Sequence, residues 1–121
     1  MTPPADHARR RHARIPIDGG HGAQDLTHGH YVRIRDLSPG GFQTEAPCDT
    51  APGSVHTFRV VLSGGGSCVV RATAIHCRAT SDERHAFIVG WKAAVDPVTA
   101  SSILQLIDEV TTITQSEVSR S

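Results

Sequence analysis

Residues 30–46 have the sequence HYVRIRDLSPGGFQTEA, in which two strand-like runs flank a turn. Apolar and polar side chains alternate from His30 to Leu37, which is typical of a strand with one buried face. The tetrapeptide at 38–41, Ser-Pro-Gly-Gly, favours a turn because proline fixes its own φ angle and glycine tolerates unusual backbone conformations. A second strand is predicted at residues 41–46. The stretch therefore predicts two antiparallel strands joined by a tight turn.

The rest of the chain continues this pattern of short strands and turns. Pro16 disfavours a helical conformation at Ile15, so a first strand is expected to begin there. Residues 18–29 contain four glycines and no periodicity, and they predict a long flexible loop. Further strands are predicted at residues 55–62, 67–79 and 85–94, with turns at 49–53 and 63–66.

The C-terminal segment has helical periodicity instead. Pro97 suits the first position of a helix, and apolar residues then recur at helical spacing: Val98, Ile103, Leu106, Ile107 and Val110. A helix is expected over 97–113, followed by a polar tail at 114–121 that frays. The predicted fold is mainly β: a small six-stranded antiparallel β-barrel with a C-terminal α-helix across one open end.

Composition limits the classes of function. The 121 residues suit one domain, and acidic and basic residues balance at 12 each. A net charge of zero and 4% aromatic residues argue against a nucleic-acid-binding barrel, which needs positive charge and stacking surfaces. No apolar run is long enough to span a membrane, and no secretory signal precedes the three cysteines, so a cytoplasmic protein with reduced thiols is expected. No catalytic motif is present, so an enzyme is not expected.

Two short motifs stand out for their order along the chain. The first is RxxxR, from Arg10 to Arg14, and the second is DxSxxG, from Asp36 to Gly41. Either motif alone has a simple structural explanation. The arginines could form a solvated charge run, and the aspartate and serine could cap a turn through side-chain bonds to the backbone.

Together, in this order and ahead of a barrel-like series of strands, the two motifs resemble those of the PilZ domain family. The resemblance covers roughly residues 9–113, with residues 1–8 expected to be disordered. It implies binding of cyclic di-GMP, a second messenger with two guanines and two bridging phosphates. The site residues that the resemblance implies are Arg9, Arg10, Arg14, Asp36, Ser38, Gly40 and Gly41.

The chemistry of these residue types agrees with such a ligand. An arginine fork matches the O6 and N7 acceptors of guanine, and it also donates to phosphate with fixed geometry. A carboxylate such as Asp36 suits the N–H donors on the Watson–Crick edge of guanine. Ser38 offers a hydroxyl to backbone or ligand, and Gly41 permits a positive φ or the close approach of a ligand.

The resemblance carries three further expectations. A basic residue just before the first motif arginine accompanies binding of two stacked nucleotides in this family, and Arg9 holds that place. Residues 9–14 are expected to be a mobile arm that becomes ordered over the ligand. The rearranged surface would then be recognised by an unidentified downstream protein. The alternative is a ligand-free PilZ-like adaptor that mediates protein–protein contacts.

The eight histidines and three cysteines suggest no metal site by their spacing. His28 and His30 could share one face and, with His21 nearby, form a weak site for a divalent ion. No cysteine or carboxylate falls at structural-zinc spacing, so solvated histidines are expected instead. Small buried thiols are the expectation for Cys68 and Cys77. Trp91 is expected to pack in the core or at its rim.

Overall fold

The computed structural model of the chain describes residues 14–80 and 86–120, with side chains as far as residue 112. The expected disorder of residues 1–8 and residues 9–13 of the expected mobile arm, Arg9 and Arg10 among them, lie outside the described residues.

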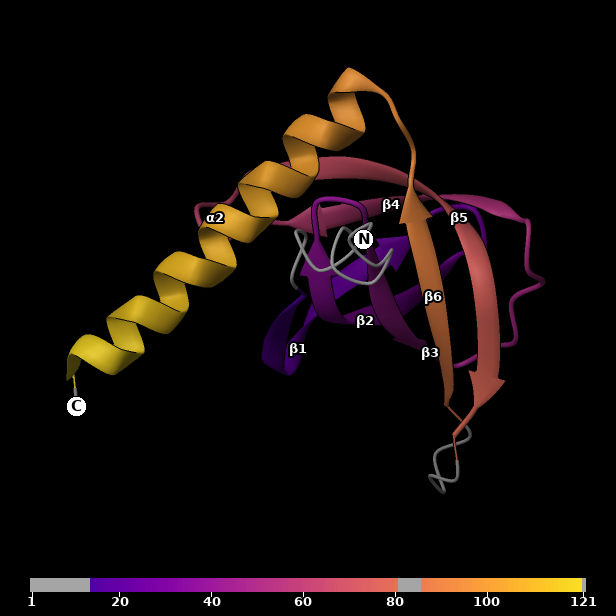
Figure 1. The fold of residues 1–121 in the computed structure, drawn as a ribbon, viewed down its shortest axis with the longest axis horizontal. Coiled ribbons are helices and arrows are strands. Elements are labelled where there is room, and N and C mark those ends of the chain that lie inside the picture. The colour runs from indigo at the N-terminus through magenta and orange to yellow at the C-terminus, as the bar shows by residue number, and fades with distance from the viewer. Residues whose placement is uncertain (1–13, 81–85, 121) are drawn as a thin grey trace, which may run out of the picture.

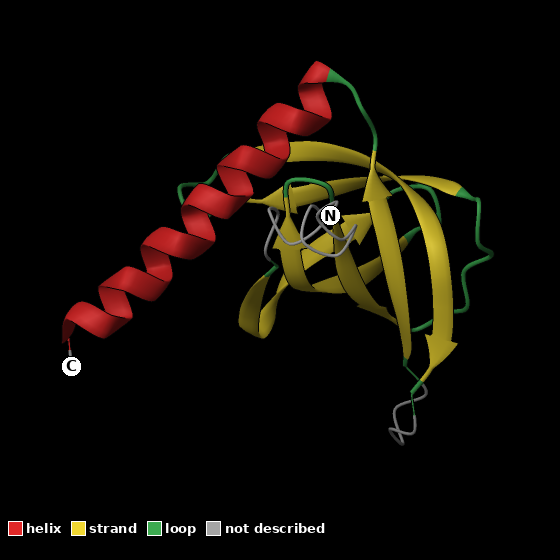
Figure 2. Ribbon diagram, in the orientation of Figure 1, coloured by secondary structure: helices red, strands yellow, loops and turns green. Residues whose placement is uncertain are grey.

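Six antiparallel strands in the described part of the chain form a closed barrel, as Figures 1 and 2 show. They are β1 (Ile15–Asp25), β2 (His30–Ser38), β3 (Gly41–Ala46), β4 (Val55–Val61), β5 (Ser67–Ala79) and β6 (Phe87–Ala93). Their order around the barrel is β1-β2-β3-β6-β5-β4, and pairing of Ala23 with Val60 and of Asp25 with Phe58 closes it. The predicted six-stranded barrel with a C-terminal helix is confirmed.

Alternate residues of each strand fill the interior of the barrel. Val32 and Ile34 of β2 are buried, whereas Arg33 and Arg35 between and beside them are exposed. Phe42, Phe58 and Trp91 pack against one another at the centre, with the rings of Phe58 and Trp91 edge to face at 4.8 Å. Trp91 is therefore a core residue, and its indole N–H donates to the Thr44 hydroxyl at 2.8 Å.

The expected loop at residues 18–29 was wrong, because β1 continues through most of it to Asp25. Gly19 and Gly20 both have a φ of 77°, and the register with β2 shifts between Pro16 and His21. The glycines thus make a bulge within a strand rather than a loop. Pairing with β2 and β4 overrides the weak strand propensity of this segment.

Helix α2 (Pro97–Arg120) begins at a cap made by Asp96, whose carboxylate accepts the N–H of Thr99 at 2.7 Å. Ile103 and Leu106 belong to the same buried cluster as the barrel interior. They lie near Leu37 and Gly41, so the helix closes the end of the barrel where β2 turns into β3. Glu109 fastens it further by accepting the N–H and the hydroxyl of Ser63 at 2.8 and 2.9 Å.

The expected end of the helix at residue 113 was too early. The helix continues to Arg120, and its C-terminal part runs past the barrel in Figure 1. The segment at 111–120 contains no glycine or proline, so no residue in it interrupts the backbone hydrogen bonds. Among the described residues, no helix has the length and apolar character needed to cross a membrane.

The turn between β2 and β3 yields a test of the fold. A Cβ atom at Gly41 would collide with the backbone carbonyl oxygen of Trp91, whereas one at Gly40 would meet nothing within contact distance. Gly41→Ala is therefore expected to lower the free energy of unfolding by about 1–3 kcal/mol, because strands β3 and β6 must separate to admit the methyl group. Urea denaturation followed by the fluorescence of Trp91 measures this.

Gly40→Ala is the matched control, and it should unfold at nearly the same urea concentration as the parent. Equal midpoints for the parent and Gly41→Ala would show that Gly41 is not held against β6 in the way described.

Candidate functional site

The DxSxxG motif forms the end of β2, a two-residue turn and the start of β3. Ser38 pairs with Gly41 across the turn, and Pro39 and Gly40 form its exposed tip. The hydroxyl of Ser38, 7% exposed, donates to the carbonyl oxygen of Gly41 at 3.3 Å. Ser38 therefore stabilises the turn from its buried side through a hydrogen bond to the backbone.

The two glycines of the motif differ in what surrounds them. Neither is among the glycines with positive φ, so the first of the two roles expected for Gly41, a left-handed backbone conformation, is not observed. Gly41 is required instead by the close approach of the Trp91 carbonyl on β6. Gly40 is exposed with open space around it, and its carbonyl oxygen accepts the N–H of Ala93 at 3.0 Å. Both glycines therefore fix the turn against β6, and the outer side of Gly40 stays accessible.

Arg14 and Asp36 join the two motifs in space. The guanidinium of Arg14 donates to a carboxylate oxygen of Asp36 at 2.8 Å. The pair forms because β1 and β2 are antiparallel, with Pro16 opposite Asp36, so Arg14 at the entry to β1 lies near the end of β2. The Arg14 side chain is 47% exposed and that of Asp36 is 20% exposed. The ion pair therefore lies at the surface, where both groups remain available to a ligand.

A surface depression of about 500 Å³ includes Pro16, which pairs with Asp36, and Arg35, which precedes Asp36 in the sequence. The rest of its lining is Ile17, Asp18 and the Gly19–Gly20 bulge of β1, Arg33 of β2 and Glu45 of β3, so two carboxylates accompany the two guanidinium groups. Arg33 and Arg35 point outward because their neighbours Val32 and Ile34 occupy the core. Two more guanidinium groups thus lie on the outer face of β2, on the N-terminal side of Asp36.

Arg33 and Arg35 were not predicted as site residues. Their alternation with apolar neighbours was the signal that could have placed them on the outer face of β2, next to Asp36. Arg9 and Arg10, which were predicted, lie outside the described residues. Of the predicted set, the structure brings together Arg14, Asp36, Ser38, Gly40 and Gly41 around one turn.

The described residues include one group that could hold a metal ion, Asp25, His28 and His56. It lies at the other end of the β1–β2 pair, because Asp25 ends β1 and the turn that contains His28 leads into β2. The ion pair of Arg14 with Asp36 therefore lies apart from this group, at the opposite end of the two strands.

Comparison with known proteins agrees with this architecture. The sequence profile of the family described as "PilZ domain" matches residues 8–109. No curated protein matches the chain.

Three solved structures illustrate the similarity. The PilZ domain of YcgR from Escherichia coli, with c-di-GMP, is 19% identical with a TM-score of 0.69, over 93% of this chain and 99% of that one. The YcgR complex with c-di-GMP is 18% identical with a TM-score of 0.68, over 93% of this chain and 50% of that one, so this chain spans about half of it. The K. pneumonia MrkH–c-di-GMP complex is 10% identical with a TM-score of 0.64, over 90% and 55% of the respective chains.

At these identities the solved structures establish the fold. The family follows from the profile, which spans most of the chain from the end of the expected disordered segment into α2. The chain therefore belongs to the PilZ domain family.

Proposed function

We propose that this chain is a receptor for cyclic di-GMP, which it binds over the turn at residues 36–41. The observation that carries the proposal is the ion pair between Arg14 and Asp36, which places parts of both motifs at one surface position. The solved relatives named above contain c-di-GMP, and their fold is the fold of this chain.

The groups at this position complement the two parts of the ligand. The guanidinium of Arg14 can meet the O6 and N7 edge of a guanine bidentately, and Asp36 can accept its N–H donors. The exposed tip at Gly40 lets a flat base lie close to the backbone. Arg33 and Arg35 supply further donors for the bridging phosphates across the adjoining depression.

Arg9 and Arg10 complete the proposed site from the segment that precedes β1. In the proposal, this segment closes over the nucleotide, and part of the binding energy offsets the cost of ordering it. A downstream protein then recognises the altered surface. The chain acts by binding and performs no reaction on the nucleotide.

Calorimetric titration with cyclic di-GMP tests the site. We expect the parent to bind and Arg14→Ala to bind about 10- to 100-fold more weakly, because charge-assisted hydrogen bonds contribute about 1.5–3 kcal/mol each. Arg71→Ala is the matched control: Arg71 is an exposed arginine on β5, across the barrel from β2, and its removal should leave the affinity unchanged.

The stability of the same variants separates binding from folding. An exposed ion pair contributes less than about 1 kcal/mol, so Arg14→Ala should unfold at nearly the parental denaturant concentration. Absence of heat and of any thermal shift with the parent would favour the ligand-free adaptor instead. Equal affinities for Arg14→Ala and Arg71→Ala would place the nucleotide elsewhere.

The number of nucleotides provides an independent prediction. We expect two molecules of cyclic di-GMP per chain, with Arg9 supporting the second. Arg9→Ala should therefore reduce the calorimetric stoichiometry from two to one while the remaining site keeps its affinity. A stoichiometry of one for the parent would remove this role from Arg9 and leave the proposed Arg14–Asp36 site standing.

A further inference from the structure

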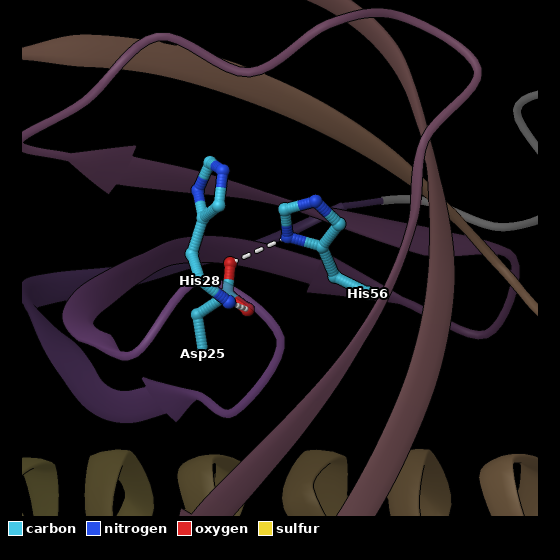
Figure 3. Close-up of side chains that lie close together, drawn as sticks. All are labelled: Asp25, His28 and His56. Carbon is cyan, nitrogen blue, oxygen red and sulfur yellow. Dashed lines mark hydrogen bonds and ion pairs between the residues drawn. The ribbon is translucent and has the colours of Figure 1, made fainter.

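A cluster of imidazoles and a carboxylate lies at the end of the barrel where β1 turns into β2. Asp25 and His56 are buried, with exposed fractions of 1% and 4%, and His28 is exposed in the turn between the two strands. One potential ligand atom from each of the three residues lies within 4.8 Å of the other two. Figure 3 shows the two rings side by side above the carboxylate.

The carboxylate of Asp25 is held rigidly. One oxygen accepts the backbone N–H groups of Thr27 and His28 at 3.1 and 3.0 Å. The other oxygen accepts from Nδ1 of His56 at 2.6 Å, so the hydrogen lies on that nitrogen, because an ionised carboxylate can only accept. The backbone bonds orient Asp25 whether or not His56 keeps this hydrogen.

His56 lies inside the barrel among aromatic side chains. Its ring centroid is 4.9 Å from that of Trp91 and 6.3 Å from that of Phe58. This packing limits the rotation of the ring and keeps Nδ1 directed at Asp25. Two of the three potential ligands are thus preorganised by the core, which reduces the entropy lost on binding an ion.

His28 closes the cluster from the solvent side. Its ring centroid is 4.7 Å from that of His56, and its Nδ1 is 3.2 Å from Nε2 of His30. The bond to His30 occupies Nδ1 and leaves Nε2 of His28 for a metal ion. Histidine ligands of metals commonly have their second nitrogen held in this way.

We propose that Asp25, His28 and His56 form a binding site for a divalent transition-metal ion with the preferences of Zn²⁺. Two imidazole nitrogens and one carboxylate oxygen are a ligand set that suits zinc, and the exposed position of His28 leaves a fourth position for water. The ion takes the place of the hydrogen between His56 and Asp25, and that proton passes to water. The two ligand atoms move apart from 2.6 Å to the spacing set by metal–ligand bonds of about 2.0–2.2 Å.

His21 is not part of the proposed site. Its Nε2 is 3.0 Å from the carbonyl oxygen of Val61 and 3.9 Å from Glu109 of α2, away from the cluster. The bound ion would instead fasten the turn at residues 26–29 to β4. Because the site lies at the opposite end of β1 and β2 from Arg14 and Asp36, it is independent of the proposed nucleotide site.

Titration of the full-length, chelator-treated chain with Zn²⁺ and with Co²⁺ tests the proposal. We expect one equivalent of Zn²⁺ to bind and to raise the melting temperature, and Co²⁺ to give the visible absorption of a tetrahedral nitrogen–oxygen site. His28→Gln should weaken Zn²⁺ binding at least tenfold. This variant is chosen because His28 is exposed, so the apo protein should fold as the parent does.

Two further variants test the support of His28 and provide a control. His30→Gln should weaken binding by a smaller factor than His28→Gln, because it removes only the support of one ligand. His76→Gln is the matched control, since His76 is an exposed histidine on β5 outside the cluster, and it should bind Zn²⁺ as the parent does.

Three outcomes would overturn the proposal. These are no stoichiometric binding by the parent, equal affinities for the parent and His28→Gln, and a cobalt spectrum with a thiolate band, which would place the ion on a cysteine. If the parent binds no zinc, the hydrogen bond between Asp25 and His56 has only a structural role. Zinc binding is expected both with and without cyclic di-GMP, so failure of the nucleotide titration would not contradict the metal site.

Discussion

The contact between Gly41 and the backbone carbonyl of Trp91 is the constraint on which the structure of the site depends. It brings β3 and β6 closer than any side chain at position 41 would allow. The same tryptophan packs against Phe42 and Phe58 and donates to Thr44, so the core and the turn at 38–41 share one anchor. Ser38 completes the turn from inside. The candidate binding surface is consequently the outer side of a rigid hairpin, to which Arg14 is joined through Asp36.

Local sequence patterns predicted most of the fold. Alternation at residues 30–37 and the Ser-Pro-Gly-Gly turn placed β2 and β3 correctly, and Pro97 marked the start of α2. The errors came where tertiary contacts outweigh local preference. The glycines of β1 suggested a loop, but pairing with strands on both sides holds them in a bulged strand. The polar residues after 113 suggested a frayed tail, although polarity alone does not end a helix.

Part of the candidate site could also be predicted from local sequence. Its motifs are local, and their order along the chain carried the resemblance, so Arg14 and Asp36 were identified before their contact was known. Arg33 and Arg35 were not included, because alternation places them on the outer face of β2 but does not distinguish an arginine that binds a ligand from one that is only solvated. The grouping of Asp25 and His56 with His28 could not be predicted, since residues 25 and 56 become neighbours only when β4 pairs with β1 to close the barrel. The two ends of the β1–β2 pair thus carry different chemistry: exposed guanidinium groups at one and buried imidazole and carboxylate at the other.

In our proposal the nucleotide binds over the turn at residues 36–41, beside Arg14. Amide chemical shifts of the isotope-labelled chain, followed by NMR during titration with cyclic di-GMP, test it most directly. We expect the largest chemical-shift changes at Arg14 and residues 36–41, smaller changes at Arg33 and Arg35, and little change around Asp25. Changes centred on α2 or on the Asp25 end of the barrel, or no changes at saturating nucleotide, would contradict it.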